Sequence, residues 1–144
     1  MRRTFSVFLV ALIAAAGPGN AGAEAFRVVA HPGVEGSRIA RSNLAAIYMR
    51  KVLRWGDRTS TQPVDQSSQS PVREAFSRMV LEASLGELQL YWRKRLVMDR
   101  VMPPPTKPSD EEVLAFVASH SGAIGYVSET VEIPPTVKLV EVYD

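Results

Sequence analysis

A run of thirteen apolar residues close to the start of the chain sets how much of the sequence is left to fold. Residues 4–16 (TFSVFLVALIAAA) follow the basic residues Arg2 and Arg3, and residues 17–19 (GPG) end the run. Residues 21–23 (AGA) then offer a small-residue cleavage site, as in a secretory signal peptide. Since thirteen residues are too few to span a bilayer, we expect export to the periplasm, cleavage near Ala23 and no membrane insertion of the mature chain.

The route of export stays open at this point. Arg2 and Arg3 followed by Thr4 and Phe5 also resemble a twin-arginine signal, although the polar part of that signal is incomplete. The general secretory route and the twin-arginine route both lead to the same mature domain, residues 24–144.

Composition excludes several classes of function. The chain has no cysteine, which rules out disulfide scaffolds, cysteine nucleophiles and thiolate metal sites. Its 17 Lys and Arg residues face 15 Asp and Glu residues, and two of the positive charges belong to the leader. The mature chain is therefore neutral, and we expect neither nucleic acid nor an anionic membrane as its partner.

Short β-branched runs alternate with helical patterns along residues 24–144, which predicts one α/β domain. Helix starts are marked by serines, two of which have a glutamate three residues later, as in a capping box. The polar segment 65–70 is predicted as a loop and the proline-rich segment 102–108 as an extended connection. We expect strands at residues 26–31, 62–64, 123–127 and 137–142, and helices after Ser42, Ser70, Ser84 and Ser109.

Several chemically interesting residues have a structural interpretation that we prefer. His31 and His120 end predicted elements, and no His-x-x-x-His pair is present. Acids are expected in a first helical turn, and the basic run 93–95 fits a solvated helix face. The acids in question are Asp110, Glu111 and Glu112. Large aromatic and aliphatic side chains are predicted to fill the core, and they include one helix stripe: Leu85, Leu88, Tyr91, Trp92 and Leu96. No nucleophile motif and no phosphate loop occurs, so we expect no enzyme activity, no cofactor and no metal.

The polar loop at residues 65–70 (DQSSQS) is the strongest candidate site. It runs into a helix N-terminus, where backbone N–H groups lack partners and the helix dipole is positive, and Arg73 follows one turn later. The alternative is a helix capped by Ser70 behind a solvated loop. The predicted ligand-binding residues are Gln66, Ser67, Ser68, Ser70 and Arg73.

Three stretches of the sequence resemble one protein family in the order in which they occur. Residues 44–51 (LAAIYMRK) and 55–57 (WGD) resemble a stretch L-x-x-I-F-x-G-K … W-x-D-G, and residues 63–76 are similar to a polar loop with its following helix. Residues 121–127 (SGAIGYV) match P-G-A-I-G-Y-V almost fully. The family is that of the phosphate-type periplasmic substrate-binding proteins of ABC transporters, within the type 2 periplasmic-binding-protein superfamily.

This resemblance implies a fold and also shows what is missing. It implies a mixed sheet flanked by about four helices, as in one lobe of a type 2 periplasmic binding protein. Members of the family close two lobes on their ligand, whereas residues 24–144 provide roughly half that length. The glycine- and threonine-rich phosphate loop of the family has no counterpart near residues 26–36. We therefore expect a single lobe.

The ligand loop departs from the pattern R-x-x-x-S-G-T of the family. Gln66 stands at the position of the arginine and supplies no charge, and Pro71 stands at the position of the glycine and removes a backbone donor. Only Ser70 retains the residue of the motif, since Val72 replaces the threonine. We expect a weak charge-assisted grip on phosphate unless Arg73 substitutes for the missing arginine.

Two functions remain open on this basis. In the first, the chain binds phosphate or another small oxyanion for ABC-type uptake or sensing, with a permease or membrane sensor as its partner. A homodimer would then supply the second wall of the cleft, because binding sites usually enclose most of their ligand. In the second, the lobe has lost its ligand and is a non-transport interaction module.

Overall fold

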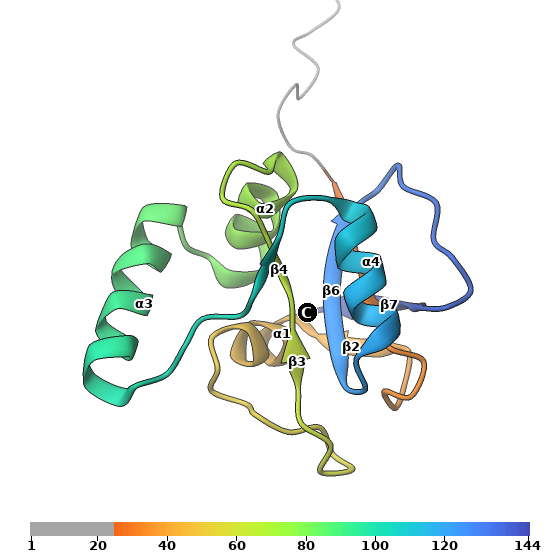
Figure 1. The fold of residues 1–144 in the computed structure, drawn as a ribbon, viewed down its shortest axis with the longest axis horizontal. Helices are drawn as coiled ribbons and strands as arrows, with labels where there is room; N and C mark the ends of the chain where they lie inside the picture. Colours follow the sequence, from red (N-terminus) through yellow and green to blue (C-terminus); the bar gives the residue numbers. More distant parts are fainter. Residues whose placement is uncertain (1–24) are drawn as a thin grey trace, which may run out of the picture.

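A mixed five-stranded sheet forms the centre of the molecule in the computed structural model, which describes residues 25–144 (Figure 1). The strand order is β2-β7-β1-β6-β3. Strand β1 (Phe26–Ala30) lies between β6 (Ala123–Ser128) and β7 (Lys138–Tyr143) and is antiparallel to both. The edge strands β2 (Arg38–Ala40) and β3 (Gln62–Pro63) run parallel to β7 and β6. The expected α/β class is confirmed, and the predicted leader, residues 1–23, lies outside the described residues.

Helices cover both faces of this sheet. Helices α1 (Arg41–Tyr48) and α2 (Pro71–Phe76), with the π-helical turn η1 (Ser77–Leu81) that continues α2, pack on the face that carries Val28 of β1. Helix α4 (Asp110–Ser119) packs on the opposite face against the next residue of β1, Val29. Successive residues of a strand point to opposite faces, so β1 contributes to both cores.

Gly125 in the middle of β6 shows how closely α4 approaches the sheet. A Cβ at this position would lie 2.8 Å from Val113 Cγ1 and 2.9 Å from Val64 Cγ1. Strand β6 is buried from Ala123 to Val127, as its unbroken apolar sequence predicts, whereas β7 alternates between half-buried and exposed residues.

The predicted loop at residues 65–70 was wrong at its first two residues. Asp65 and Gln66 form strand β4, which pairs in parallel with β5 (Thr106–Lys107) in a separate two-stranded sheet. The backbone N–H groups of Asp65 and Ser67 donate to the carbonyl oxygens of Pro105 (2.8 Å) and Lys107 (3.0 Å). A proline-rich segment is compatible with this pairing, because proline lacks an N–H donor but its carbonyl oxygen can still accept a hydrogen bond from β4.

Helix boundaries follow the predicted serines in three of four cases. Ser84 forms a full capping box, with its Oγ 3.2 Å from the backbone nitrogen of Glu87 and its own nitrogen 2.8 Å from Glu87 Oε2. Ser109 Oγ accepts a hydrogen bond from the backbone nitrogen of Glu112, as in a capping box. The Glu112 carboxylate accepts from the Ser109 hydroxyl and not from the Ser109 backbone nitrogen, so only half of the box is formed. The expectation for Ser42 was wrong, because β2 runs directly into α1 and Ala40 occupies the cap position.

Helix α3 (Leu85–Asp99) lies at the edge of the molecule, away from the main sheet (Figure 1). Only Leu88 of its predicted apolar stripe is fully buried, and Leu96 is 46% exposed, so the expectation of a core-facing stripe was largely wrong. Two polar contacts attach the helix to the end of α1: Tyr91 Oη donates to Met49 O (2.8 Å) and Arg95 Nη2 to Arg50 O (3.3 Å). Across residues 25–144, no helix has both the length and the apolar character needed to cross a membrane.

Candidate functional site

The polar segment between β4 and α2 is built around a buried glutamine. Gln66 is 2% exposed, and its Nε2 donates to Asp110 Oδ1 (2.8 Å) and to the carbonyl oxygen of Tyr126 (3.0 Å). Its Oε1 accepts from Ser70 Oγ (2.8 Å). One side chain therefore ties β4, α2, α4 and β6 together, and its amide has a partner at both ends.

Ser70 occupies the cap position of α2, as the sequence predicts, with Pro71 at the first helical position. Its hydroxyl makes no capping bond to the helix, however, because it donates to Gln66. The backbone nitrogen of Ser70 donates to the carbonyl oxygen of Ser67 (2.9 Å), which closes the loop into a tight turn. The conformation of the loop is therefore fixed by contacts among its own residues.

Arg73 lies one turn into α2 and reaches back to the same strand. Its Nη1 donates to the carbonyl oxygen of Gln66 (2.9 Å), and its Nη2 lies 3.5 Å from Asp65 Oδ2. The Arg73 side chain is 15% exposed, and its Nε is buried without a hydrogen-bond partner within residues 25–144. The guanidinium group therefore neutralises a buried carboxylate and keeps one donor unused.

Asp65 is the residue of this site that sequence reasoning missed. Its Oδ1 accepts hydrogen bonds from Tyr126 Oη and from the backbone nitrogen of Gln66. Burial raises the pKa of Asp65, against the lowering effects of Arg73, Tyr126 and the Gln66 nitrogen. The pKa of Tyr126 is also raised, first by burial and then by the negative charge of Asp65. Tyr126 lies 61 residues away along the chain, so no local pattern connects the two side chains.

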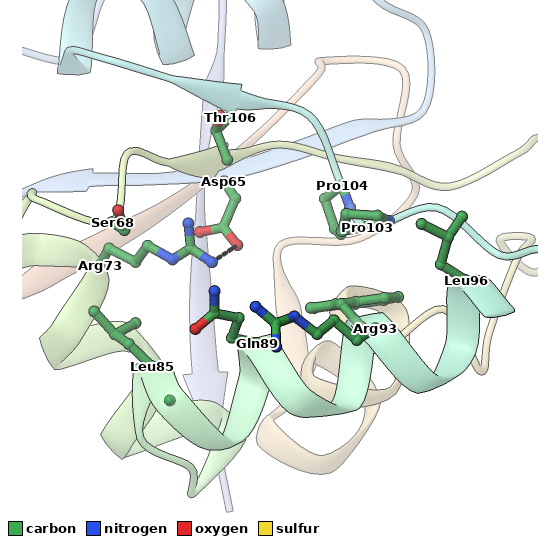
Figure 2. Close-up of a pocket in the computed structure, with 12 residues that line it drawn as sticks. Asp65, Ser68, Arg73, Leu85, Gln89, Arg93, Leu96, Pro103, Pro104 and Thr106 are labelled. Carbon is green, nitrogen blue, oxygen red and sulfur yellow. Dashed lines mark ion pairs between the residues drawn. The ribbon is translucent and has the colours of Figure 1, made fainter.

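The loop separates two open hollows, and the five predicted residues divide between them. Gln66, Ser67 and Ser70 line the first hollow, about 590 Å³, together with the start of α4. Ser68 and Arg73 line the second, about 560 Å³, which lies between α3 and the β4–β5 pair (Figure 2). Asp110 and Glu111 also line the first hollow, and their negative charges oppose an anion there.

The histidines and the acidic cluster have local structural partners. His31 Nδ1 accepts from the backbone nitrogen of Gly33 (3.0 Å), and the ring of His120 stacks on Phe116 with centroids 3.9 Å apart. Asp110 Oδ1 accepts from Gln66 and from the nitrogen of Ser128 (3.1 Å). In the part of the chain that the structure describes, no three His, Asp or Glu side chains gather in a way that could hold a metal ion.

Comparison with solved structures identifies the fold. The chain superposes on an ABC-type phosphate transport receptor from Vibrio cholerae with a TM-score of 0.64 at 16% identity. It superposes on PstS from Borrelia burgdorferi with a TM-score of 0.65 at 15% identity. It superposes on a phosphate ABC transporter substrate-binding protein from Clostridium perfringens, solved with bound phosphate, with a TM-score of 0.65 at 18% identity. The chain has the fold of a single lobe of these binding proteins. The resemblance seen in the sequence motifs is thus confirmed at the level of the fold.

The similarity covers most of this chain but less than half of the proteins that it matches. It covers 83–84% of this chain but 45–48% of those three proteins, so the chain spans less than half of their length. No protein-family model matches the sequence, and no curated protein matches it. At this level of identity the similarity shows the fold of residues 25–144, while the ligand is a separate question.

Proposed function

We propose that this chain is an exported, one-lobed relative of solute-binding proteins that binds phosphate or another small oxyanion for ABC-type uptake or sensing. The observation that carries the proposal is the fold, which it shares with receptors described as binding phosphate. Removal of residues 1–23 on export to the periplasm belongs to the same proposal, since the leader has the pattern of a signal peptide. The chain acts by binding and not by catalysis.

The proposed site is the loop after β4 with Arg73. Ser67 and Ser68 offer hydroxyl groups at its surface, and Arg73 contributes a positive charge that it shares with Asp65. Gln66 and Ser70 complete the site by holding the loop in place through their mutual hydrogen bond. Oxyanions are recognised by this combination of charged and neutral donors.

The partners follow from the single lobe. A binding site usually encloses most of its ligand, and one lobe leaves one side of an ion open to water. A second copy of the chain, an ABC permease or a membrane sensor could supply the opposite wall. A symmetric dimer would place two copies of the loop in one interface.

A second candidate function is a non-transport interaction module that has lost its ligand. It is favoured by the existing contacts of Arg73, whose guanidinium group is already engaged by Asp65 and by the carbonyl oxygen of Gln66. The acidic residues at the start of α4 favour it too, because they face the first hollow. In this case the loop is a structural feature, and the surface of the lobe carries the function.

Calorimetric titration of the purified chain with phosphate and sulfate at low salt separates the two candidates. If the loop binds an oxyanion, Ser68→Ala and Arg73→Lys weaken the binding, and added salt weakens it further. Ser121→Ala is the matched control, because Ser121 is also exposed and lies outside both hollows. The absence of binding heat from a chain with a folded circular dichroism spectrum would rule out the first function and favour the second.

A further inference from the structure

We propose that the hollow between α3 and the β4–β5 pair binds a small organic anion, namely a carboxylate carried on a flat apolar body. This site shares Ser68 and Arg73 with the loop proposed above, and it goes beyond that proposal because α3 and the proline-rich connection supply the rest of its wall. Its volume of about 560 Å³ falls within the range of roughly 300–1,000 Å³ that is usual for small-molecule sites. It is also large for an inorganic oxyanion.

Charge in this hollow favours a single negative group. Asp65, Arg73 and Arg93 all line it, and the first two form an ion pair with each other. Arg93 makes no ion pair within residues 25–144, so its charge is uncompensated. Figure 2 shows Arg73, Gln89 and Arg93 directed into the same space beneath Asp65. One net positive charge with an amide beside it matches a monocarboxylate.

The remaining wall is apolar and partly planar. Side chains from α3 and from the proline-rich connection lie on opposite sides of the hollow, where Figure 2 shows Leu96 facing Pro103. Apolar lining of this kind gains free energy by removing hydrocarbon from water, and an indole ring adds a flat stacking surface. The apolar lining consists of Leu85, Trp92, Leu96, Pro103 and Pro104.

Arg73 and Arg93 play different parts in this hollow. The guanidinium group of Arg73 is already engaged by Asp65 and by the carbonyl oxygen of Gln66, so the free positive charge comes from Arg93. A carboxylate oxygen placed beside Arg93 and the Gln89 amide meets that charge. The sequence favoured structural roles for Trp92 and Arg93, whereas the structure brings both to one hollow.

The test uses benzoate as the probe. Its binding is measured by calorimetry and by the indole Nε1–H signals of the two tryptophans in ¹H–¹⁵N spectra. Trp92 lines the hollow, whereas Trp55 donates its Nε1–H to Gly122 O (2.9 Å) elsewhere, so benzoate shifts the Trp92 signal and leaves that of Trp55 in place. Arg93→Gln weakens benzoate binding about tenfold, since one charged hydrogen bond is lost. Lys94→Gln, the exposed neighbour that does not line the hollow, keeps the affinity of the parent chain. Benzyl alcohol, which lacks the charge, binds more weakly than benzoate.

Several results would overturn the proposal. These are no saturation by benzoate at about 10 mM, equal affinity of the Arg93→Gln and parent chains, or a shift confined to Trp55. Equal affinities for benzoate and acetate would also contradict it, because the apolar wall would then contribute nothing. A failure of phosphate to bind on its own concerns only the function proposed for the loop, so the two proposals fail separately.

Discussion

The hydroxyl of Tyr126 donates a hydrogen bond to the buried carboxylate of Asp65. This bond joins β6 of the main sheet to β4 of the small sheet, and the Tyr126 ring is held by stacking on Phe76, with centroids 4.0 Å apart. Arg73 completes the arrangement from α2. The position of the candidate loop therefore depends on a charge buried beneath it, and the first three predictions concern this network.

Arg73→Met is expected to destabilise the fold by about 3 kcal/mol at neutral pH, because it leaves the Asp65 carboxylate buried without its counter-charge. Denaturant unfolding measures the change. The matched control is Arg78→Met, which removes an arginine from an ion pair with Glu74 whose partners are 71% and 53% exposed, and which should change little. The double variant Asp65→Asn/Arg73→Met should lose less than Arg73→Met alone, and an equal loss would contradict the role given to Arg73.

The pH dependence of stability should carry the signature of Asp65. Its pKa is raised in the folded chain, chiefly by burial, so the native state holds this proton more tightly than the unfolded state does. Asp65 therefore contributes stability that is fully present below the unfolded pKa, near 3.8, and is lost as pH rises through its folded pKa. We expect the parent chain to lose stability relative to Asp65→Asn across this window, measured by denaturant unfolding at several pH values. The opposite slope would mean that Arg73 outweighs burial.

Gln66→Ala is expected to cost about 1–3 kcal/mol, because it leaves Ser70 Oγ without its acceptor and removes one of the two hydrogen bonds to Asp110 Oδ1. Gln62→Ala provides the comparison, since Gln62 is exposed. Thermal unfolding of both variants measures the difference. Similar melting temperatures would show that the buried amide does not stabilise the loop.

Gly122 and Gly36 form a matched pair for testing backbone strain, since both have φ near +81°. At Gly36 a Cβ would meet nothing within 4 Å. Gly36→Ala should therefore lower the free energy of unfolding only by the penalty for a side chain in the left-handed conformation, about 1 kcal/mol. At Gly122 a Cβ would collide with the carbonyl oxygen of Ser60, so Gly122→Ala should cost markedly more. Chemical denaturation of the two variants isolates the steric part, and equal losses would argue against the close approach.

Sequence reasoning succeeded where the signal was local. The buried strand β6 followed from the apolar run AIGYV, and the start of α3 from Ser84 with Glu87 three residues later. The start of α2 followed from Ser70 and Pro71. Each of these features depends on residues that lie within one turn or one strand of each other.

It failed where distant segments decide the structure. Strand β4 has two residues and exists only because a connection forty residues later offers acceptors to it, so its own polar sequence predicts a loop. The stripe of α3 was assigned to the core because helical spacing reports which residues share a face, and not what that face meets. The site was affected in the same way: the motif located the loop, but neither Asp65 nor the hollow beside Trp92 has a local signature.

Among residues 25–144, the central strand of the sheet is the first strand along the chain, and its two neighbours in the sheet are the last two. Strand β1 ends at Ala30, whereas β6 and β7 begin at Ala123 and Lys138. Residues 31–122 must therefore be synthesised before β1 can pair on either side. Such non-local closure is slow compared with helix formation. Both edges of β1 consequently stay without their sheet partners until the two strands from the far end of the described residues have been made.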